Sequence, residues 1–310
     1  MNMRKKVRKL LMEKDYIFTS GVANAMEAMI LEKAGFDFIY VSGSGTSITQ
    51  LGLVDVGLIT ETEMVNNARN IAKAVNIPVF ADADNGYGNA INVIKTVEDF
   101  EAAGVAGIHI EDQESPKRCG HFAGKSIIPI EEAVGKIRAA VDAKRDKDFI
   151  IIARTDSVAA VGGGFAEAVR RGKAYARAGA DVVFCEFSSP DIEEPRRFAE
   201  ELHKEFPALP LFFNFSNNLK WYESPLTFDD IARLGYKIFI VSTGCIRVSK
   251  QAVTDYAVDL MNRKEQAVKD FQRTEKENLA DFGGLEQIKA LEQKYLPNED
   301  VINKHKTVGI

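Results

Sequence analysis

The chain has 310 residues, of which 45% are hydrophobic and 27% are charged, so it is long enough to bury a sizeable core. Its formal net charge of −5 argues against the basic face that a nucleic-acid partner requires. No apolar run approaches the roughly 18 residues of a membrane span, and the basic N-terminus lacks the apolar core of a signal peptide. We therefore expect a cytoplasmic protein with neither a nucleic-acid nor a membrane partner.

Strand-like apolar runs alternate with helical segments along most of the chain. After a first surface helix, eight runs have the length and branched residues of buried strands: 17–22, 36–41, 78–83, 107–111, 149–153, 182–186, 211–215 and 238–242. The segments between them repeat apolar residues at helical spacing, most clearly at 62–74, 91–103, 130–143, 165–178 and 192–206. Since such strands joined by helices form a parallel sheet covered on both faces, eight units predict an α/β fold. It is expected to be a closed (β/α)8 TIM-type barrel rather than an open doubly wound sheet.

Segment 262–310 breaks this alternation, so we predict two domains, a catalytic barrel at 1–261 and a C-terminal helical extension at 262–310. The first part of the extension, 262–280, is highly charged, whereas 285–296 carries an apolar stripe. A finished barrel cannot bury that stripe, so we expect it to pack on a neighbouring subunit. The alternative is that the extension folds back on its own chain.

Polar or small residues follow most of the predicted strands at their carboxyl ends. In a barrel these ends meet at one mouth, which is where active sites of this fold are built. A single polar strand end needs no function, because exposed ends are polar anyway. Seven together indicate a binding mouth, and they contribute Ser42, Gly43, Ser44, Asp82, Asp84, Glu111, Arg154, Glu186, Asn214, Ser216 and Ser242.

Reactive residue types gather after the fourth predicted strand, in Lys117-Arg118-Cys119-Gly120-His121. A thiol flanked by two cations and an imidazole suits a proton donor, a base or a nucleophile. The alternative is a solvated basic loop that happens to include a cysteine. Cys185 and Cys245 lie in apolar stretches and are interpreted as core residues, and His109 as a satisfied core histidine. Three cysteines at wide spacings imply neither a disulfide framework nor a zinc site.

Two carboxylates, Asp82 and Asp84, stand two residues apart at the end of the third predicted strand. In an extended strand such residues share a face, so the carboxylates repel each other unless a cation lies with them. Mg²⁺ fits, because it binds oxygen and needs only one or two protein carboxylates beside water and substrate. Glu111 can orient metal-bound water from behind. Alternatively, Asp82 or Asp84 caps the glycine-rich loop that follows or pairs with Arg154.

Six short motifs follow one another between about residues 15 and 260. They are Tyr40-Val41-Ser42-Gly43-Ser44-Gly45, Leu53-Val54-Asp55-Val56-Gly57, Asp82-Ala83-Asp84-Asn85-Gly86-Tyr87-Gly88, Glu111-Asp112-Gln113, Lys117-Arg118-Cys119-Gly120-His121 and Ala153-Arg154-Thr155-Asp156. In this order they resemble the isocitrate lyase / phosphoenolpyruvate mutase superfamily. The resemblance implies a (β/α)8 barrel whose eighth helix swaps between the subunits of a dimer, usually within a homotetramer.

The same resemblance assigns roles to the strand ends. It implies that Ser42, Gly43 and Ser44 hold the substrate carboxylate and that Arg154 binds the reacting acid group. The Mg²⁺ site, which Mn²⁺ can also fill, would be faced by Asp55, Asp82 and Asp84, with Asp84 nearest and Glu111 behind. The remaining candidates for substrate binding are Lys117, Arg118, Gly120 and Ser242.

The cysteine motif is similar to that of the carbon-carbon lyases of the superfamily, chiefly 2-methylisocitrate lyase and 2,3-dimethylmalate lyase. This implies cleavage of a 2-hydroxy di- or tricarboxylate into a 2-oxo acid and a second carboxylic acid. Tyr40 would be the base and Cys119 the proton donor, with His121 and Glu186 positioning the loop and its thiol. Similar loops in carboxyphosphonoenolpyruvate mutases and oxaloacetate hydrolases leave those activities as alternatives. A non-catalytic barrel is a remoter one.

The seventh predicted strand bears on the substrate. Asn214, Ser216 and Asn218 alternate at its end, so three uncharged donors are expected on the face that points into the mouth. Small lyases of the superfamily tend to have a glutamate in this stretch, which would repel a carboxylate, whereas isocitrate lyases have a stretch similar to this one. We therefore expect isocitrate-like or methylisocitrate-like acids to be cleaved better than 2,3-dimethylmalate or oxaloacetate. The alternative is that the polar triplet only caps the strand.

Overall fold

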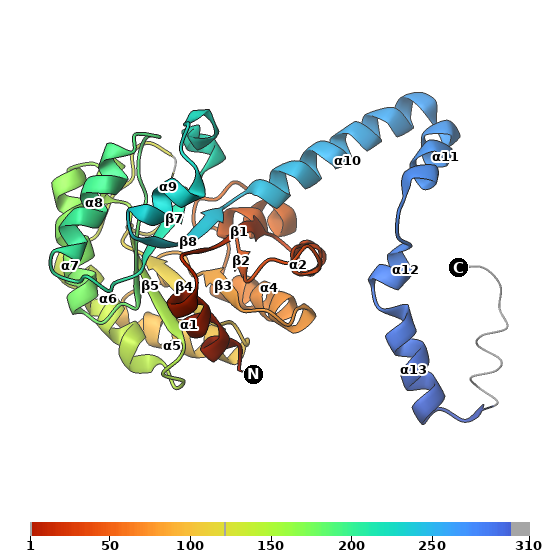
Figure 1. The fold of residues 1–310 in the computed structure, drawn as a ribbon, viewed down its shortest axis with the longest axis horizontal. Helices are drawn as coiled ribbons and strands as arrows, with labels where there is room; N and C mark the ends of the chain where they lie inside the picture. The colour runs from red at the N-terminus through yellow and green to blue at the C-terminus, as the bar shows by residue number, and fades with distance from the viewer. Residues whose placement is uncertain (1, 121, 299–310) are drawn as a thin grey trace. The chain divides into compact units, whose positions relative to one another are not determined.

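The computed structural model of the protein describes residues 2–120 and 122–298. Eight parallel strands pair in chain order and close into a barrel, which confirms the predicted architecture (Figure 1). The strands are β1 Ile17–Val22, β2 Ile39–Val41, β3 Val79–Asp82, β4 Gly107–Glu111, β5 Ile150–Thr155, β6 Val182–Cys185, β7 Leu211–Asn214 and β8 Tyr236–Val241. Because every strand runs in the same direction, the carboxyl ends of all eight strands meet at one end of the barrel.

Helices connect the strands and cover the outside of the barrel (Figure 1). They are α2 Ala25–Lys33, α3 Gly43–Thr46, α4 Glu61–Ala74, α5 Ala90–Ala102, α6 Ile130–Ala143, α7 Phe165–Arg177, α8 Glu193–His203 and α9 Phe228–Arg233. Local sequence fixes several of their starts. Thr60 and Glu63 form a capping box before α4, in which each side chain accepts a hydrogen bond from the other residue's backbone N–H.

The barrel interior is a packed apolar core whose amino end is closed by the first helix, α1 Met3–Glu13. Val7 of α1 is fully buried in the same cluster as inward-facing strand residues such as Phe80 and Phe212. Arg8 donates to three backbone carbonyls just before β5, those of residues 147–149. Helix α1 covers the amino end of the barrel and donates hydrogen bonds to backbone carbonyls there. The carboxyl end is therefore where a ligand can enter the barrel.

Contacts divide the chain into two units, one ending at Ser249 and the other beginning at Lys250. The helices that follow the barrel are α10 Gly244–Arg263, α11 Glu265–Thr274, α12 Leu279–Phe282 and α13 Leu285–Tyr295. Helix α10 runs across the predicted domain boundary at residue 261 and buries none of its side chains; Val253 and Met261 are 66% and 82% exposed. Within the described part of the chain, no helix has the length and apolar character needed to cross a membrane.

Candidate active site

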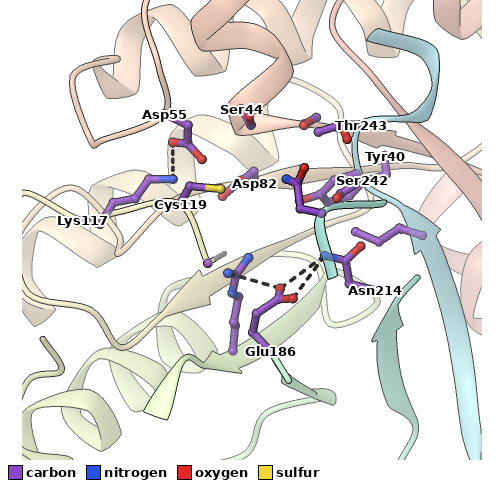
Figure 2. Close-up of a pocket in the computed structure, with 15 residues that line it drawn as sticks. Tyr40, Ser44, Asp55, Asp82, Lys117, Cys119, Glu186, Asn214, Ser242 and Thr243 are labelled. Atoms are coloured by element: carbon purple, nitrogen blue, oxygen red, sulfur yellow. Dashed lines mark hydrogen bonds and ion pairs between the residues drawn. The ribbon is translucent and has the colours of Figure 1, made fainter. Parts of the chain in front are cut away.

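A pocket opens at the carboxyl ends of the strands, at the mouth that the sequence predicts (Figure 2). It encloses about 460 Å³ of empty space, its open mouth included. The pocket is lined by Tyr40, Ser42, Ser44, Asp55, Asp82, Lys117, Cys119, Gly120, Arg154, Glu186, Asn214, Asn218, Ile240, Ser242 and Thr243. Only Ile240 and Thr243 in this set are absent from the predicted site. Gly43, Asp84, Glu111, Arg118 and Ser216 do not line it, and His121 lies outside the described residues.

The turn after β2 brings backbone and hydroxyl groups close to Asp82. Ser42 begins the short helix α3, and its Oγ accepts a hydrogen bond from Gly45 N at 3.1 Å. A Cβ atom on Gly43 would lie 2.5 Å from Asp82 Oδ2. Glycine is therefore required at residue 43 for the Asp82 carboxylate to approach this turn so closely.

Asp82 and Asp84 do not lie on one face of an extended strand, so that part of the metal argument is wrong. Strand β3 ends at Asp82, and Asp84 has φ +46°, in the left-handed region. This turn lets Asp84 N donate to Asp82 Oδ1 at 2.9 Å, and it sends the two carboxylates to different partners. Asp82 Oδ1 lies 3.4 Å from His109 Nε2, whereas Asp84 Oδ1 lies 2.9 Å from Lys117 Nζ. Asp82 and His109 are opposite one another in the β3–β4 register, which explains the first contact.

Lys117 forms a buried charge cluster with Asp55 and Asp84, which we call the Lys117 cluster. Its Nζ lies 2.5 Å from Asp55 Oδ1 and 2.9 Å from Asp84 Oδ1, and Figure 2 shows its contact with Asp55. Burial alone would lower the pKa of Lys117, but Asp84 and Asp55 raise it well above the usual value, so the ammonium stays charged. Burial raises the pKa of Asp84 to about 7 even though Lys117 opposes it. One ammonium therefore does not fully compensate two buried carboxylates.

The carboxylates of Asp82 and Asp84 fit a metal ion that takes few ligands from the protein. Among residues 2–120 and 122–298, no three His, Cys, Asp or Glu side chains converge closely enough to hold a metal ion alone. Mg²⁺ does not need such a cage, because it keeps several waters and binds through one or two carboxylates plus substrate oxygens. The incompletely compensated carboxylate of Asp84, next to Asp82, is suited to such an ion.

Arg154 forms a second buried charge cluster with Asp156, Glu111 and Glu186, which we call the Arg154 cluster. Its Nε and Nη2 donate to the two oxygens of Asp156 at 2.8 and 3.0 Å. Glu186 Oε2 and Glu111 Oε2 lie 3.3 and 3.4 Å from the guanidinium. Glu111 and Arg154 face each other in the β4–β5 register, which explains their contact. A guanidinium held by three carboxylates is fixed in orientation before any substrate arrives.

Tyr40 reaches His109 beneath the pocket. Tyr40 Oη lies 2.8 Å from His109 Nε2, and both side chains are buried. Burial lowers the pKa of His109 to about 4, so its ring is neutral near pH 7, and burial also raises the pKa of Tyr40 well above its usual value. His109 is therefore a core histidine, as predicted, but only half satisfied, because its Nδ1 is buried without a hydrogen-bond partner. The one sequence feature that pointed to His109 is its place in the strand that leads into Glu111.

The loop after β4 is held against the site rather than extended into solvent. Cys119 N donates to Asp55 O at 3.1 Å, and the thiol of Cys119 is directed into the pocket (Figure 2). Arg118 is exposed, and its Nη1 donates to Ala123 O at 3.3 Å, so its guanidinium lies along the loop instead of in the pocket. Cys185 is buried, consistent with its interpretation as a core residue, whereas Cys245 is half-buried.

The polar triplet after β7 is only partly where the alternation predicts it. Strand β7 ends at Asn214, and residues Asn217–Leu219 form a 3-10 turn, so the side chains no longer alternate. Asn214 and Asn218 line the pocket, whereas Ser216 is buried and its Oγ accepts from Asn218 N at 3.2 Å. Asn214 Nδ2 contacts Glu186 Oε2 at 3.3 Å. Ser216 thus caps the turn, as the alternative interpretation expects for the triplet.

Sequence reasoning missed a cation at the rim of the pocket. Arg247 is exposed at the start of α10, where its Nη2 donates to the Asn218 side chain and its Nε to Thr243 Oγ1 at 3.2 Å. Both acceptors line the pocket. The available signal was the spacing, since Thr243 and Arg247 are four residues apart at the start of a helix and so share one face.

Comparisons with known proteins show what this chain is similar to. The family model described as phosphoenolpyruvate phosphomutase matches residues 7–261. The isocitrate lyase of Haloferax volcanii is 41% identical over 271 residues, which cover 87% of this chain and 79% of that protein. The 2,3-dimethylmalate lyase of Eubacterium barkeri is 42% identical over 297 residues, which cover 95% of this chain and 99% of that protein.

Solved structures show the same barrel. The phosphoenolpyruvate phosphomutase from Streptomyces platensis subsp. rosaceus matches with a TM-score of 0.87 at 31% identity, covering 95% of this chain and 99% of that one. A phosphonopyruvate hydrolase in complex with oxalate and Mg²⁺ matches with a TM-score of 0.82 at 32% identity, covering 96% and 100%. The similar proteins therefore comprise lyases, a mutase and a hydrolase.

Proposed function

This chain belongs to the isocitrate lyase / phosphoenolpyruvate mutase superfamily, and on that premise we propose that it is a Mg²⁺-dependent carbon-carbon lyase. Its substrate is a 2-hydroxy di- or tricarboxylate, which it cleaves into a 2-oxo acid and a second carboxylic acid. The observation that carries this proposal is Cys119, whose thiol faces a pocket that also contains Asp82 and Arg154. A lyase of this kind needs a proton donor there, and a thiol can serve.

Binding is divided between the two charge clusters. Asp82 and Asp84 would hold Mg²⁺, which when bound lowers the pKa of the substrate hydroxyl and offsets the charge of the neighbouring carboxylate. Arg154 presents donors to the acid group of the substrate, and Ser42 and Ser44 lie in the same pocket to receive its carboxylate oxygens. Three carboxylates hold the Arg154 guanidinium, so little reorganisation is needed when the substrate arrives.

Proton movement starts at Tyr40. The raised pKa of Tyr40 makes a free tyrosinate unfavourable, so Tyr40 would pass its own proton to His109 Nε2 as it takes one from the substrate hydroxyl. Burial of His109 opposes this transfer, and the Asp82 carboxylate, 3.4 Å from His109 Nε2, favours it. The C2–O bond then becomes a carbonyl and the C2–C3 bond breaks. Its electron pair is left on C3, where it is delocalised into the adjoining carboxylate as an enediolate. Cys119 supplies a proton to C3, which releases the second acid and leaves a thiolate to be reprotonated.

The test is a product assay across a panel of acids with Mg²⁺ present. Isocitrate, 2-methylisocitrate and 2,3-dimethylmalate should each be examined for release of a 2-oxo acid, with oxaloacetate and phosphonopyruvate beside them. The proposal expects a 2-oxo acid from at least one of the 2-hydroxy acids, with turnover lost in Cys119→Ser. Cleavage of oxaloacetate or phosphonopyruvate alone would overturn the lyase assignment.

A hydrolase or mutase of the same superfamily is the second candidate, and the specific observation in its favour is structural likeness. A phosphoenolpyruvate phosphomutase and a phosphonopyruvate hydrolase match this chain over 95% or more of its length. A hydrolase would release oxalate and acetate from oxaloacetate, and a mutase would convert phosphonopyruvate to phosphoenolpyruvate without cleaving a carbon-carbon bond. The same panel therefore separates the three activities.

The exposed apolar side chains of α10 support a homotetramer whose helices are swapped between subunits. Val248, Val253, Val258 and Met261 are all more than half exposed in the single chain. Side chains of this kind are usually covered in an assembly. Light scattering on the purified protein tests this: a monomer at micromolar concentration would contradict the swapped tetramer, and Val253→Lys should weaken the assembly.

A further inference from the structure

A second buried lysine, Lys125, lies behind the loop that carries Cys119, and the mechanism above does not use it. Lys125 is 1% exposed, and its Nζ donates to Gly120 O at 2.5 Å and to Asp156 Oδ1 at 2.9 Å. Gly120 follows Cys119 directly in the chain, and Asp156 is the carboxylate that holds Arg154 through two hydrogen bonds. One ammonium therefore contacts both the loop and the strand-borne half of the site.

The loop and the Arg154 cluster are packed directly against each other at this point. A Cβ atom on Gly120 would lie 2.3 Å from Arg154 Nη2 and 3.1 Å from Asp156 Oδ1. The backbone at Gly120 thus rests on the guanidinium and its carboxylate partner, and the carbonyl of Gly120 is turned toward Lys125. Burying an ammonium without hydrogen-bond partners costs free energy. Lys125 therefore needs both contacts, and both form only while the Gly120 backbone stays packed against Arg154 and Asp156.

We propose that Lys125 is a positioning residue for the proposed lyase reaction, because it ties the Gly120 carbonyl to Asp156. In this role it fixes two things at once: the backbone that places the Cys119 thiol and the carboxylate that orients Arg154. The inference rests on the proposed function for its kinetic consequences. Its geometric consequence, the restraint on the loop at Cys119, is independent of which reaction the enzyme catalyses.

The chain offers a matched control in Lys144. Its Nζ also donates to one backbone carbonyl, Phe149 O at 3.2 Å, and to one carboxylate, Asp181 Oδ2 at 2.9 Å. These contacts lie at the amino end of β5, whereas Lys125 acts at the carboxyl end, beside the pocket. Lys144→Met therefore removes the same kinds of contact without touching the loop. Lys144→Met therefore shows how far the loss of a lysine remote from the pocket changes stability and activity.

The experiment compares Lys125→Met, Lys125→Arg and Lys144→Met in the full chain. The first readout is the rate at which iodoacetamide alkylates Cys119 in the protein without substrate, measured on the Cys119 peptide by mass spectrometry. Alkylation reports the accessibility of the thiol, which is half-buried in the pocket and becomes more exposed when the loop is less restrained. The second readout is kcat and KM for the substrate found in the panel, with Mg²⁺ present, and the third is Tm.

In Lys125→Met we expect iodoacetamide to alkylate Cys119 about 10-fold faster than in the parent. We also expect kcat to fall by about 10²-fold with a smaller change in KM, because a displaced proton donor affects turnover more than binding. Lys125→Arg should recover part of both, since it restores a charged donor. Lys144→Met should lower Tm without changing either the alkylation rate or kcat.

The proposal is overturned if Cys119 in Lys125→Met is alkylated within twofold of the rate in the parent protein. It is also overturned if Lys125→Met and Lys144→Met lower kcat by the same factor. If Lys125→Met does not fold, the same alkylation rate is measured in Lys125→Gln, whose side chain keeps one nitrogen donor group, and the same twofold limit applies. If the parent enzyme cleaves no 2-hydroxy acid, the proposed function fails, while the alkylation comparison still supports or overturns the role of Lys125.

Discussion

The Lys117 cluster and the Arg154 cluster are both buried and both pair one cation with carboxylates, yet they are built differently. Lys117 comes from a loop and offers a compact ammonium to Asp55 and Asp84. Arg154 comes from strand β5, and its planar guanidinium contacts three carboxylates. Asp156 accepts two hydrogen bonds from it, whereas Glu186 and Glu111 lie 3.3 and 3.4 Å away. Arg154 is therefore positioned by the barrel sheet itself, whereas Lys117 is positioned by the connection after β4.

This difference suggests a division of labour between the clusters. The Arg154 guanidinium is held in place by three acidic side chains before substrate binds, so the Arg154 cluster suits recognition of the acid group that reacts. The Lys117 cluster leaves the ionised form of Asp84 disfavoured, as its raised pKa of about 7 shows, so it suits a site where a further cation can add or replace charge. The four predictions below test this division, from the largest expected effect to the smallest.

Arg154→Met should have the largest effect, because it leaves Glu111, Asp156 and Glu186 buried without their shared cation. We expect the free energy of unfolding to fall by about 3–5 kcal/mol, as for a buried ion pair that loses one partner. We also expect kcat/KM to fall by about 10³-fold. Urea titration and steady-state kinetics measure the two.

The control for this variant is Arg171→Met. Arg171 is also buried, and its Nη1 contacts Asp112 Oδ2 at 3.1 Å, outside the pocket. It should lose stability while keeping most of the activity per folded molecule. If both variants lose the same activity, the Arg154 cluster has no special catalytic role.

Removal of the metal should act through the other cluster. Chelation should abolish turnover, and addition of Mg²⁺ or Mn²⁺ should restore it. Asp84→Asn should lower kcat/KM by about 10²-fold or more, since a lost metal contact costs at least as much as a lost residue behind the ligands. Mg²⁺ should raise the Tm of the parent, as a ligand that binds only the folded state does, but not the Tm of Asp84→Asn.

Asp181→Asn, at the amino end of the barrel, is the matched control for Asp84→Asn, because it keeps the pocket unchanged. It should retain the Mg²⁺-dependent rise in Tm. Full activity in excess EDTA would break the assignment of the Lys117 cluster as the cation side of the site.

Cys119→Ser should lower kcat by about 10²-fold, the usual scale for a positioned acid-base group. Because Cys119 is held through its backbone N–H to Asp55 O, the fold and the Mg²⁺-dependent Tm shift should be retained. Cys245→Ser is the control, since Cys245 does not line the pocket. Near-parental kcat in a folded Cys119→Ser protein would remove Cys119 from the mechanism and leave the two clusters without a proton donor between them.

Arg247→Gln should have the smallest effect and tests the rim beyond both clusters. Arg247 contacts Asn218 and Thr243 at the edge of the pocket, where it can attract an extra carboxylate of a tricarboxylic substrate. Its exposure limits the gain, so we expect kcat/KM for isocitrate or methylisocitrate to fall about 10-fold. The value for 2,3-dimethylmalate, which has one carboxylate fewer, should stay within about twofold.

Comparing kcat/KM across the panel of acids shows whether this prediction fails. The tricarboxylic acids should lead the panel in the parent enzyme. If 2,3-dimethylmalate or oxaloacetate leads by tenfold, the interpretation of Asn214, Asn218 and Arg247 as a tricarboxylate subsite is wrong.

The sequence by itself determined the architecture and most members of the site. Strand-like runs and helical spacing identified eight strands and the closed barrel, because burial on both faces makes parallel strands apolar along their length. The predicted span of β4 matches the structure at both ends, at Gly107 and Glu111. Polar residues at strand ends, together with the cysteine motif, named most of the residues that line the pocket, and the family resemblance added Tyr40 and Asp55.

Tertiary structure alone decided which of these residues pair. The register of β4 with its neighbours sets Glu111 against Arg154 and His109 against Asp82, and no spacing within one strand contains that information. Backbone turns decided two further points: the left-handed φ of Asp84 separated it from Asp82, and the end of β7 at Asn214 turned Ser216 away from the pocket. Side-chain contacts between segments distant in the chain form only once the barrel closes. This is why Lys125 and its link to Asp156 became visible only in the folded molecule.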